Sequence, residues 1–353
     1  MEISFNHIEE LLSNLIRNPS FSKQEAAAAD VLESFFKIQG LKTNRKDNNV
    51  WVLNKYFDPA KETILLNSHH DTVRPGSDWT RDPFIPIIED DKLYGLGSND
   101  AGAALVSLIA VFLHYYDAQN LDFNLIMLAS AEEEISGLNG VESVIGSLGK
   151  IDFGIIGEPT GMQMAIAEKG LMVLDCLAEG TSGHAAKESG INAIYIALED
   201  IKWLRNYRFP LTSDVLGPIK MTATMIESGS QHNVIPDTCK FVVDVRNTDS
   251  YSNEEVLQII KDNMRSQVIA RSTRLQPSAI SGDHVLVKTA KNLGIKTFGS
   301  DTLSDQALMN FPTVKMGPGD SLRSHTADEY IKLNEIQKGI EIYIQVLDKI
   351  ICS

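Results

Sequence analysis

Histidine and acidic residues follow apolar segments at several points along this chain. Residues 63–68 form a largely apolar run that leads directly into His69, His70 and Asp71. A buried strand delivers side chains in this way to the rim of an open α/β sheet, the usual place for chemistry in such sheets. Imidazole and carboxylate groups held at strand ends are also the ligands that hard or borderline divalent metal ions prefer. The stretch is a candidate site, although alone it is more typical of a surface turn.

Four later positions have the same form, in which an acid or a histidine follows an apolar strand or lies in a glycine-rich turn. Two histidines and three carboxylates, one of them bridging, would hold two metal ions and leave the site one charge positive, ready for a hydroxide. Each motif by itself has a plainer interpretation, such as a solvated charge run at residues 132–134 or a helix start near residue 325. Their joint occurrence favours one metal site built from His69, Asp100, Glu134, Glu158 and His325.

The composition argues against several classes of protein. The chain has 353 residues, of which 43% are hydrophobic, and this length suggests about two domains. A net charge of −15 argues against a nucleic-acid partner. Three cysteines without a CxxC motif favour reduced thiols in the cytoplasm over a disulfide framework or a structural zinc site. The N-terminus lacks the pattern of a signal peptide, and no apolar run approaches the ~18 residues that a membrane span requires.

Alternating helical and strand patterns predict an α/β architecture for the first half of the chain. Apolar residues at helical spacing predict a helix at residues 6–18, and a capping-box pattern predicts that the next helix is capped by Ser22 with Glu25. A nearly all-apolar helix at residues 101–116 must be buried on most faces. Strands are expected at residues 43–45, 49–54, 63–68, 123–128 and 151–156, which together read as a βαβ sheet.

The pattern changes after about residue 168 and returns near residue 278. The intervening order of strand, helix, two strands and helix fits a small α+β unit, with its helices at residues 192–206 and 253–264. A strand at residues 314–316 and a final helix at 334–350 then resume the α/β pattern. The predicted organisation is a catalytic domain made of residues 1–168 and 276–353, interrupted by an inserted domain at residues 169–275.

Together, these motifs resemble the M20 family of metallopeptidases and deacylases over essentially the whole chain and in the same order. The histidine-x-aspartate motif of the family is matched by His69 and Asp71, and its glycine-rich turn by residues 95–100. Its acidic pair is matched by Glu133 and Glu134, although three successive glutamates leave a shift by one residue open. The chain departs from the family pattern at Arg74, where an apolar residue is usual, and at residues 101–104.

The resemblance implies a mixed-sheet zinc-hydrolase domain with an inserted, ferredoxin-like α+β domain for dimerisation or for use as a lid. It implies that Asp71 orients His69, that His70 is not a ligand and that Glu133 is the general base. Zinc is the usual metal, with cobalt as a substitute. The implied ligands are His69, Asp100 and Glu158 for one ion, and Asp100, Glu134 and His325 for the other.

Further residues carry implied roles in binding the substrate. His184 is expected to reach the active site of a partner subunit and to hydrogen-bond the scissile carbonyl, so a homodimer through the inserted domain is expected. Asn233 and Arg246 are expected near the substrate, because a planar bidentate donor suits an α-carboxylate. A salt bridge within the inserted domain is the plainer interpretation of Arg246. Backbone N–H groups at Gly317 and Gly319 could serve the same carboxylate.

The function implied by the resemblance is metal-dependent hydrolysis of a linear amide. The residues around Asp100 and His325 are most similar to those of acetylornithine deacetylases, so the expected substrate is an N-acetyl or N-succinyl derivative of ornithine or citrulline, in arginine biosynthesis. Succinyl-diaminopimelate desuccinylases and dipeptidases or aminopeptidases of the same fold are alternatives, and so is a non-catalytic metal-binding module. Arg74 would favour a succinyl carboxylate if it lay in the pocket, but the sequence does not rank the acyl groups.

Overall fold

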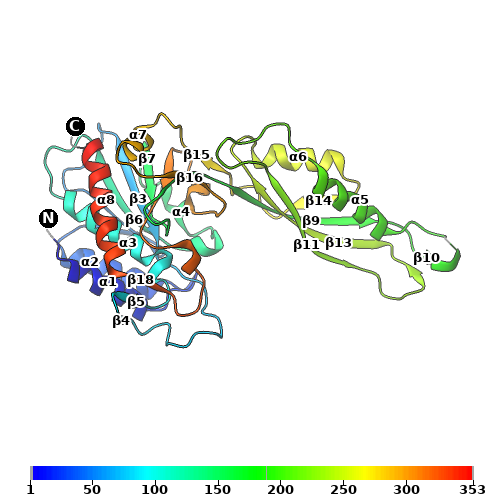
Figure 1. The fold of residues 1–353 in the computed structure, drawn as a ribbon, viewed down its shortest axis with the longest axis horizontal. Coiled ribbons are helices and arrows are strands. Elements are labelled where there is room, and N and C mark those ends of the chain that lie inside the picture. Colours follow the sequence, from blue (N-terminus) through cyan, green and yellow to red (C-terminus); the bar gives the residue numbers. More distant parts are fainter. Residues whose placement is uncertain (1–2, 188, 352–353) are drawn as a thin grey trace. The chain divides into compact units, whose positions relative to one another are not determined.

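The computed structural model describes residues 3–187 and 189–351, and the chain divides into two compact units (Figure 1). Unit 1 takes in the residues up to 166, residues 280–298 and the residues from 304 onward. Unit 2 takes in residues 167–279 and 299–303. The insertion expected at residues 169–275 therefore covers most of unit 2, which also includes a short segment from the later part of the chain.

Most strands of a mixed β-sheet form the centre of unit 1, while β15 and the ends of β8 and β16 fall in unit 2. The strand order is β1-β2-β6-β3-β7-β17-β8-β15, and β16 also pairs with β8. Strands β6, β3, β7 and β17 are mutually parallel, whereas β1, β2, β8 and β15 join their neighbours antiparallel. The bounds are β1 Thr43–Lys46, β2 Asn49–Leu53, β3 Thr63–His69, β6 Asn124–Ser130, β7 Phe153–Ile156, β8 Met164–Glu168, β15 Ser278–Ala279, β16 Thr297–Ser300 and β17 Thr313–Lys315.

Helices and a small second sheet complete unit 1. The helix α3 is almost entirely buried, as its nearly all-apolar sequence predicts, and it packs against the central sheet, α1 and α8. Such burial removes each large side chain from water at a gain of about 1.5–3 kcal/mol. The helices are α1 Phe5–Arg17, α2 Ala26–Ile38, α3 Ala103–Tyr115, α4 Val141–Ile145, α7 Val285–Asn292 and α8 Leu333–Ile351, and the small sheet consists of β4 Ile87–Glu89, β5 Lys92–Tyr94 and β18 Tyr330–Lys332.

The N-terminus of α2 differs from the prediction. The helix begins at Ala26, and the residue before it, Glu25, makes no capping hydrogen bond with its side chain. Lys23 has a left-handed backbone, with φ of 71°, which separates Ser22 from the helix. The Ser22 hydroxyl instead donates to Asp71 Oδ2 at 2.7 Å. The predicted capping box was therefore wrong, because its serine holds a residue of the candidate site.

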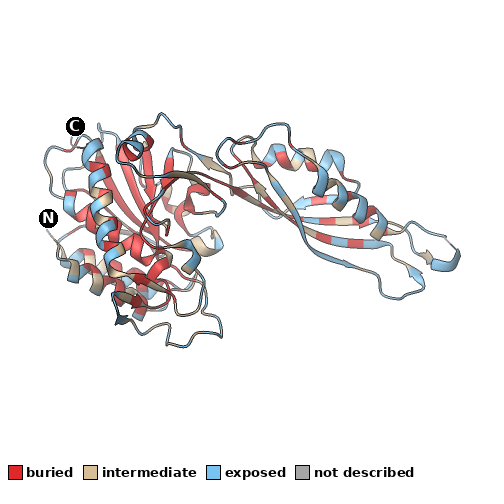
Figure 2. Cartoon of the chain, in the orientation of Figure 1, coloured by how far each residue is buried: buried red, intermediate tan, exposed pale blue. Residues whose placement is uncertain are grey.

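Unit 2 has the βαββαβ order of a ferredoxin-like fold. Its antiparallel sheet has the order β11-β13-β9-β14, and the two helices supply apolar side chains to a core on one face of this sheet. Burial alternates residue by residue along β9 and β13, as Figure 2 shows. The elements are β9 Gly170–Glu179, β10 Gly183–His184, α5 Ala193–Asn206, β11 Lys220–Ser228, β12 Val234–Ile235, β13 Thr238–Asn247, α6 Asn253–Asn263 and β14 Gln267–Ala270.

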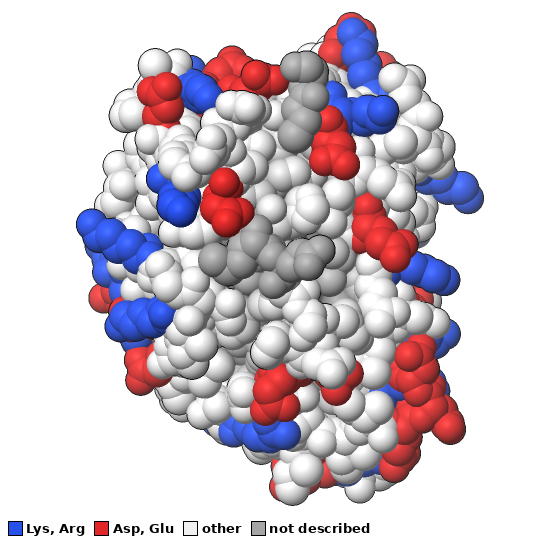
Figure 3. Space-filling view, turned by 90° about the vertical axis from the view of Figure 1, so that its left-hand side faces the viewer, with Lys and Arg blue, Asp and Glu red and all other residues white. Residues whose placement is uncertain are grey.

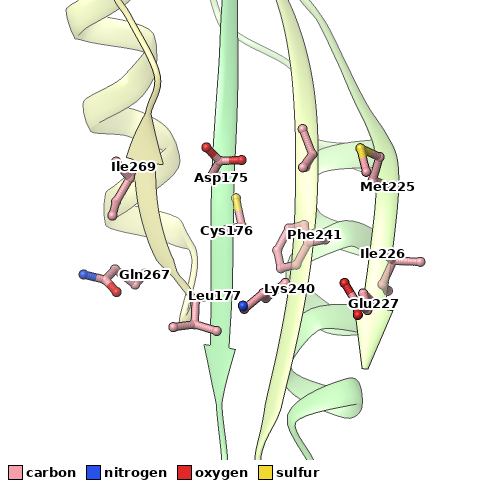
Figure 4. Close-up of a pocket in the computed structure, with 11 residues that line it drawn as sticks. Asp175, Cys176, Leu177, Met225, Ile226, Glu227, Lys240, Phe241, Gln267 and Ile269 are labelled. Atoms are coloured by element: carbon pink, nitrogen blue, oxygen red, sulfur yellow. The ribbon is translucent and has the colours of Figure 1, made fainter. Parts of the chain in front are cut away.

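The other face of the unit 2 sheet is uncovered. A groove along it is lined by apolar residues such as Leu177, Ile226 and Ile269, together with Asp175 and others (Figure 4). None of the predicted site residues lines this groove. The groove is therefore separate from the predicted site residues.

The outside of the molecule carries charges of both signs. On the face in Figure 3, acidic and basic side chains are interspersed, and Lys and Arg do not gather into one continuous patch. None of the helices formed by the described residues is long and apolar enough to cross a membrane.

Candidate metal centre

The parallel strands of unit 1 end where the predicted metal ligands lie. His69 is the last residue of β3, and β6 ends at Ser130, just before the glutamates at 132–134. Glu158 lies two residues beyond β7. Because parallel strands present their carboxyl ends at one edge, side chains from distant parts of the chain meet there. Asp100 joins them from the turn before α3, and His325 from the loop before β18.

Asp100 lies between the two histidines. Its Oδ1 is 3.3 Å from His69 Nε2, and its Oδ2 is 3.6 Å from His325 Nε2. A glutamate approaches the same nitrogen of each histidine: Glu158 Oε1 is 3.8 Å from His69 Nε2, and Glu134 Oε2 is 3.0 Å from His325 Nε2. Each oxygen of the Asp100 carboxylate thus faces its own imidazole, which is the arrangement expected of a bridging ligand.

These spacings suit a pair of divalent ions. Two donors at about 2.1 Å from one tetrahedral zinc ion lie about 3.4 Å apart, and the donor pairs here lie between 3.0 and 3.8 Å. Candidate ligand atoms of His69, Asp100 and Glu134 lie within 4.8 Å of one another, as do those of His69, Glu133 and Glu158. The imidazole and carboxylate donors present therefore fit a metal centre, although neither group coincides with one of the two ligand sets that the resemblance implies.

The three successive glutamates have different environments. Glu132 has a left-handed backbone, with φ of 53°, and its buried carboxylate accepts hydrogen bonds from the backbone and side chain of Asn139. Glu133 faces the cluster, with its Oε2 3.9 Å from His69 Nε2, and Glu134 contacts His325. The geometry therefore favours Glu133 and Glu134 as the acidic pair, without a shift by one residue.

Asp71 organises the site through its backbone and its side chain. His69 Nδ1 lies 3.0 Å from the Asp71 carbonyl oxygen and 3.5 Å from its Oδ1, so Nδ1 carries a proton and Nε2 faces the cluster. The Asp71 carboxylate also accepts hydrogen bonds from the backbone N–H groups of Glu133 and Glu134. The role expected for Asp71 thus extends from the histidine to the acidic pair. His70 points elsewhere, with its Nε2 donating to the Asn48 carbonyl.

The cluster strongly perturbs the pKa values of its members. Burial raises the pKa of Glu158 to about 8, and the nearby Asp100 charge adds to this effect. Burial and the Glu158 carboxylate likewise raise the pKa of Glu133 well above its usual range. The hydrogen bond that His325 donates to the Glu134 carboxylate raises the pKa of His325 to about 9. Without a cation, crowded carboxylates retain protons because their negative charges repel one another.

Metal binding is therefore expected to release protons at pH 7. The raised pKa values mean that the metal-free cluster holds protons on Glu158 and His325, whereas ligands must be deprotonated. Calorimetric titration of the metal-free protein with Zn²⁺ in buffers of different ionisation enthalpy should show release of more than about one proton per protein. The apparent affinity should rise between pH 6 and pH 9. A binding heat that does not depend on the buffer would contradict this expectation.

Three predicted substrate-binding residues lie in unit 2. Strands β10 and β12 pair His184 with Val234, and Asn233 accepts a hydrogen bond through its carbonyl from the Ala185 N–H. The His184 loop and Asn233 are thus neighbours. Arg246 makes a bidentate ion pair with Asp244, at 2.9 and 3.2 Å. Its guanidinium group is engaged within its own strand, as the plainer interpretation predicted.

The glycines near His325 lie in unit 1 beside the cluster. The Gly317 N–H donates to Thr160 Oγ1 at 3.0 Å, so the expectation that it is offered to a substrate carboxylate does not fit. Gly319 has a φ of 99°, and a Cβ atom there would lie 2.5 Å from Asn99 Oδ1. Only glycine is compatible with this close approach to the Asp100 loop.

Two buried acids beside the cluster were not anticipated. Asp305 accepts hydrogen bonds from Asn67, within β3, and from Ser130, the last residue of β6. Glu329 accepts hydrogen bonds from the loop that carries Asp100. The only signal for Glu329 in the sequence is its place four residues after His325.

Comparison with a family model agrees with the resemblance seen in the motifs. The model of peptidase family M20/M25/M40 matches residues 65–349, a range that includes every candidate ligand. The chain is 30% identical over 314 residues to an acetylornithine deacetylase of Pectobacterium atrosepticum, covering 82% of this chain and 80% of that protein. It is 25% identical over 372 residues to succinyl-diaminopimelate desuccinylase 2 of Ruegeria sp., covering 96% and 93%.

Solved structures share the fold. The aminopeptidase PepT of Bacillus cereus superposes with a TM-score of 0.77 at 20% identity, covering 98% of this chain and 99% of that chain. A dinuclear metal-binding peptidase of the M20 family from Bacillus subtilis superposes with a TM-score of 0.71 at 14% identity, covering 97% and 96%. At these identities the likeness establishes the fold alone.

Proposed function

The chain belongs to peptidase family M20/M25/M40, and from this premise we propose that it removes an acetyl or succinyl group from an amino acid such as ornithine or citrulline, in arginine biosynthesis. The relatives named as acetylornithine deacetylase and succinyl-diaminopimelate desuccinylase act on substrates of this kind. Both release an amino acid by hydrolysis of a linear amide. The alternative within the family is a dipeptidase or aminopeptidase.

The observation that carries the proposal is the position of Asp100 between His69 and His325. We propose two divalent ions, zinc with cobalt as a substitute, bound by His69, Asp100 and Glu158 and by Asp100, Glu134 and His325. The dinuclear peptidase of the same fold supports this count. Bound ions would supply Lewis acidity and would lower the pKa of the attacking water toward ~7.

Glu133 is the proposed general base. Its raised pKa suits a group that takes a proton from the attacking water and then delivers it to the leaving nitrogen. The hydrogen bond from the Glu133 N–H to Asp71 fixes the backbone at this residue. The partly exposed His325 leaves one side of the cluster open to an incoming substrate.

His184 is the proposed donor to the carbonyl oxygen of the substrate. Its Nδ1 accepts the Ala186 N–H at 3.2 Å, so the proton of the neutral ring is on Nε2, which is free to act as a donor. A hydrogen bond that strengthens as charge develops on that oxygen would stabilise the transition state. Asn233, next to the same loop, and Gly319 are proposed contacts for the substrate carboxylate. Arg246 would first have to give up its pair with Asp244.

We further propose a homodimer through unit 2 in which His184 serves the site of the partner. The edge strand β11 exposes Met225 and Ile226, and α5 exposes Tyr195 and Leu198. An open strand edge with apolar neighbours is a surface that a second copy can cover.

Buried thiols at Cys176 and Cys239, which form no disulfide, support a reducing, cytoplasmic setting.

Mixed dimers are expected to test the contribution of the partner. Glu133→Gln and His184→Ala should each be nearly inactive alone, the second by about 10²–10³-fold in kcat. Equal mixing with subunit exchange should restore about one quarter of the wild-type sites, because half of the dimers then hold one complete site. Mixtures that stay as inactive as their parents would show that His184 does not act across the dimer.

An amine-release assay tests the substrate class. N-acetylornithine, N-acetylcitrulline, their succinyl analogues, N-succinyl-diaminopimelate and a Leu-Ala dipeptide would be compared by kcat/KM with zinc or cobalt added. Release from an acyl amino acid at least about 100-fold above the dipeptide is expected, a difference of about 2.7 kcal/mol in transition-state binding. A higher kcat/KM for the dipeptide would show that the enzyme is a peptidase and not a deacylase.

A further inference from the structure

Glu329 is a buried carboxylate that binds the backbone of the Asp100 loop. It is 2% exposed. Its Oε1 accepts the N–H groups of Asn99 and Asp100 at 2.8 and 2.9 Å, and its Oε2 accepts the Gly97 N–H at 3.0 Å. The Glu329 carbonyl also accepts the Gly95 N–H. These backbone donors offset part of the cost of burying the carboxylate.

The Asp100 loop has little regular structure of its own to fix it. Gly95 and Gly97 have positive φ values of 154° and 74°, and Asp100 itself has a non-helical backbone before α3 begins. Its position therefore depends on contacts from outside the loop. Besides Glu329, these include an Asn99 side chain that donates to the Asp320 carbonyl and accepts the Asp320 N–H.

The segment that supplies Glu329 also supplies His325. Both His325 and Asp328 have left-handed backbones, with φ of 58° and 52°, a conformation unfavourable for residues other than glycine. Such backbones persist where the surroundings hold them in place, often at functional sites. Here the Asp328 carboxylate accepts the N–H groups of Thr80 and Arg81, and β18 pairs with β5 beyond it (Figure 1). Glu329 thus joins the segment of one candidate ligand to the loop of another.

We infer that Glu329 is a positioning residue, which sets the distance between Asp100 and His325 before any ion binds. This inference rests on the proposed metal-dependent function, because positioning the ligands matters only if they bind metal. Its effects on the loop and on metal binding can be measured without substrate. A carboxylate that serves stability alone would lower the unfolding temperature when replaced and leave the ligand geometry unchanged. A positioning carboxylate should alter the loop and the metal affinity.

Glu329→Gln keeps the size of the side chain but removes the charge, and it places an NH₂ group against a backbone donor. Asp200→Asn is the matched control. The Asp200 carboxylate is also buried, and it accepts the N–H groups of Arg265 and Ser266 within unit 2. Both variants lose charge-assisted hydrogen bonds to backbone N–H groups, so both should lose some stability, but only one acts on the Asp100 loop.

Hydrogen exchange in the metal-free protein provides the first measurement. Amides at Gly97, Asn99 and Asp100 should exchange at least about tenfold faster in Glu329→Gln than in the wild type. In Asp200→Asn the faster exchange should be confined to residues around 265–266. Unchanged protection of the Asp100 loop in Glu329→Gln would overturn the inference.

Titration with Co²⁺, followed by its visible absorption, provides the second measurement. Glu329→Gln should bind Co²⁺ about 10–100-fold more weakly and with an altered spectrum, while Asp200→Asn matches the wild type. Glu329→Asp, whose shorter side chain keeps the charge, should recover part of the affinity, and it replaces the glutamine variant if that variant does not fold. Wild-type affinity and spectrum in the Glu329 variants would overturn the inference. Failure to hydrolyse any acyl amino acid would refute the proposed function without affecting these two readouts.

Discussion

Glu133→Gln is expected to lower kcat by about 10³-fold or more, with KM and metal content nearly unchanged. The amide has the shape of the carboxylate but cannot accept a proton from water, and the loss corresponds to about 4 kcal/mol in the activation free energy. The backbone of residue 133 would still donate to Asp71, so the site should keep its geometry. The measurement is steady-state kinetics together with metal analysis of the purified variant.

Its neighbour Glu132 provides the control. That side chain hydrogen-bonds Asn139 instead of facing the cluster, so Glu132→Gln should retain kcat and lose at most a little thermal stability. If the Glu133→Gln enzyme keeps more than about a tenth of the wild-type kcat, Glu133 is not the general base. Collapse of activity in Glu132→Gln instead would show that the acidic pair is shifted by one residue.

Asp100→Asn is expected to disrupt both ion sites, whereas His325→Ala should disrupt one. The two Asp100 oxygens face different histidines, and an amide offers only one oxygen and no charge. Metal content after gel filtration should fall from two ions toward none in Asp100→Asn, with affinity at least about 100-fold weaker, and toward one in His325→Ala. Activity should fall by about 10³-fold or more in Asp100→Asn.

A distant carboxylate shows whether the loss is specific. Asp152 accepts the Thr63 N–H at the start of β3, at the opposite end of the strand from His69. Asp152→Asn should therefore keep both ions. Equal metal contents in Asp100→Asn and His325→Ala would argue that Asp100 serves only one ion and is not a bridge.

The sequence predicted best where one physical signal dominated. The apolar runs that became β3, β6 and β7 placed His69, the acidic pair and Glu158 at neighbouring strand ends. Alternation along residues 238–245 correctly predicted the strand β13 and its buried face. The family resemblance was needed to assign His325 to the same ion as Asp100 and Glu134, because no local pattern links these residues.

Contacts distant in sequence account for what was missed. Ser22 looked like a helix cap, yet it donates to Asp71, which lies on another element. Glu329 looked like part of a helix start, but its partners are amides about 230 residues earlier in the chain. Arg246 was assigned to substrate by its type, whereas Asp244, two residues away, occupies its guanidinium group. The partner of each of these side chains depends on which group comes close after folding. The spacing of residues in the sequence does not reveal that.

The order of the chain has a consequence for synthesis on the ribosome. Unit 1 is interrupted by residues 167–279, and both α8, which covers α3, and the last candidate ligand come after the interruption. At 5–20 residues per second, translation of the interrupting segment takes on the order of 10 s. During that time the apolar surface of α3 lacks its final cover, while the whole of β9 to β14 can already fold. The metal centre can therefore be completed only near the end of translation, and a chain truncated before residue 325 would carry four of the five candidate ligands and lack the last.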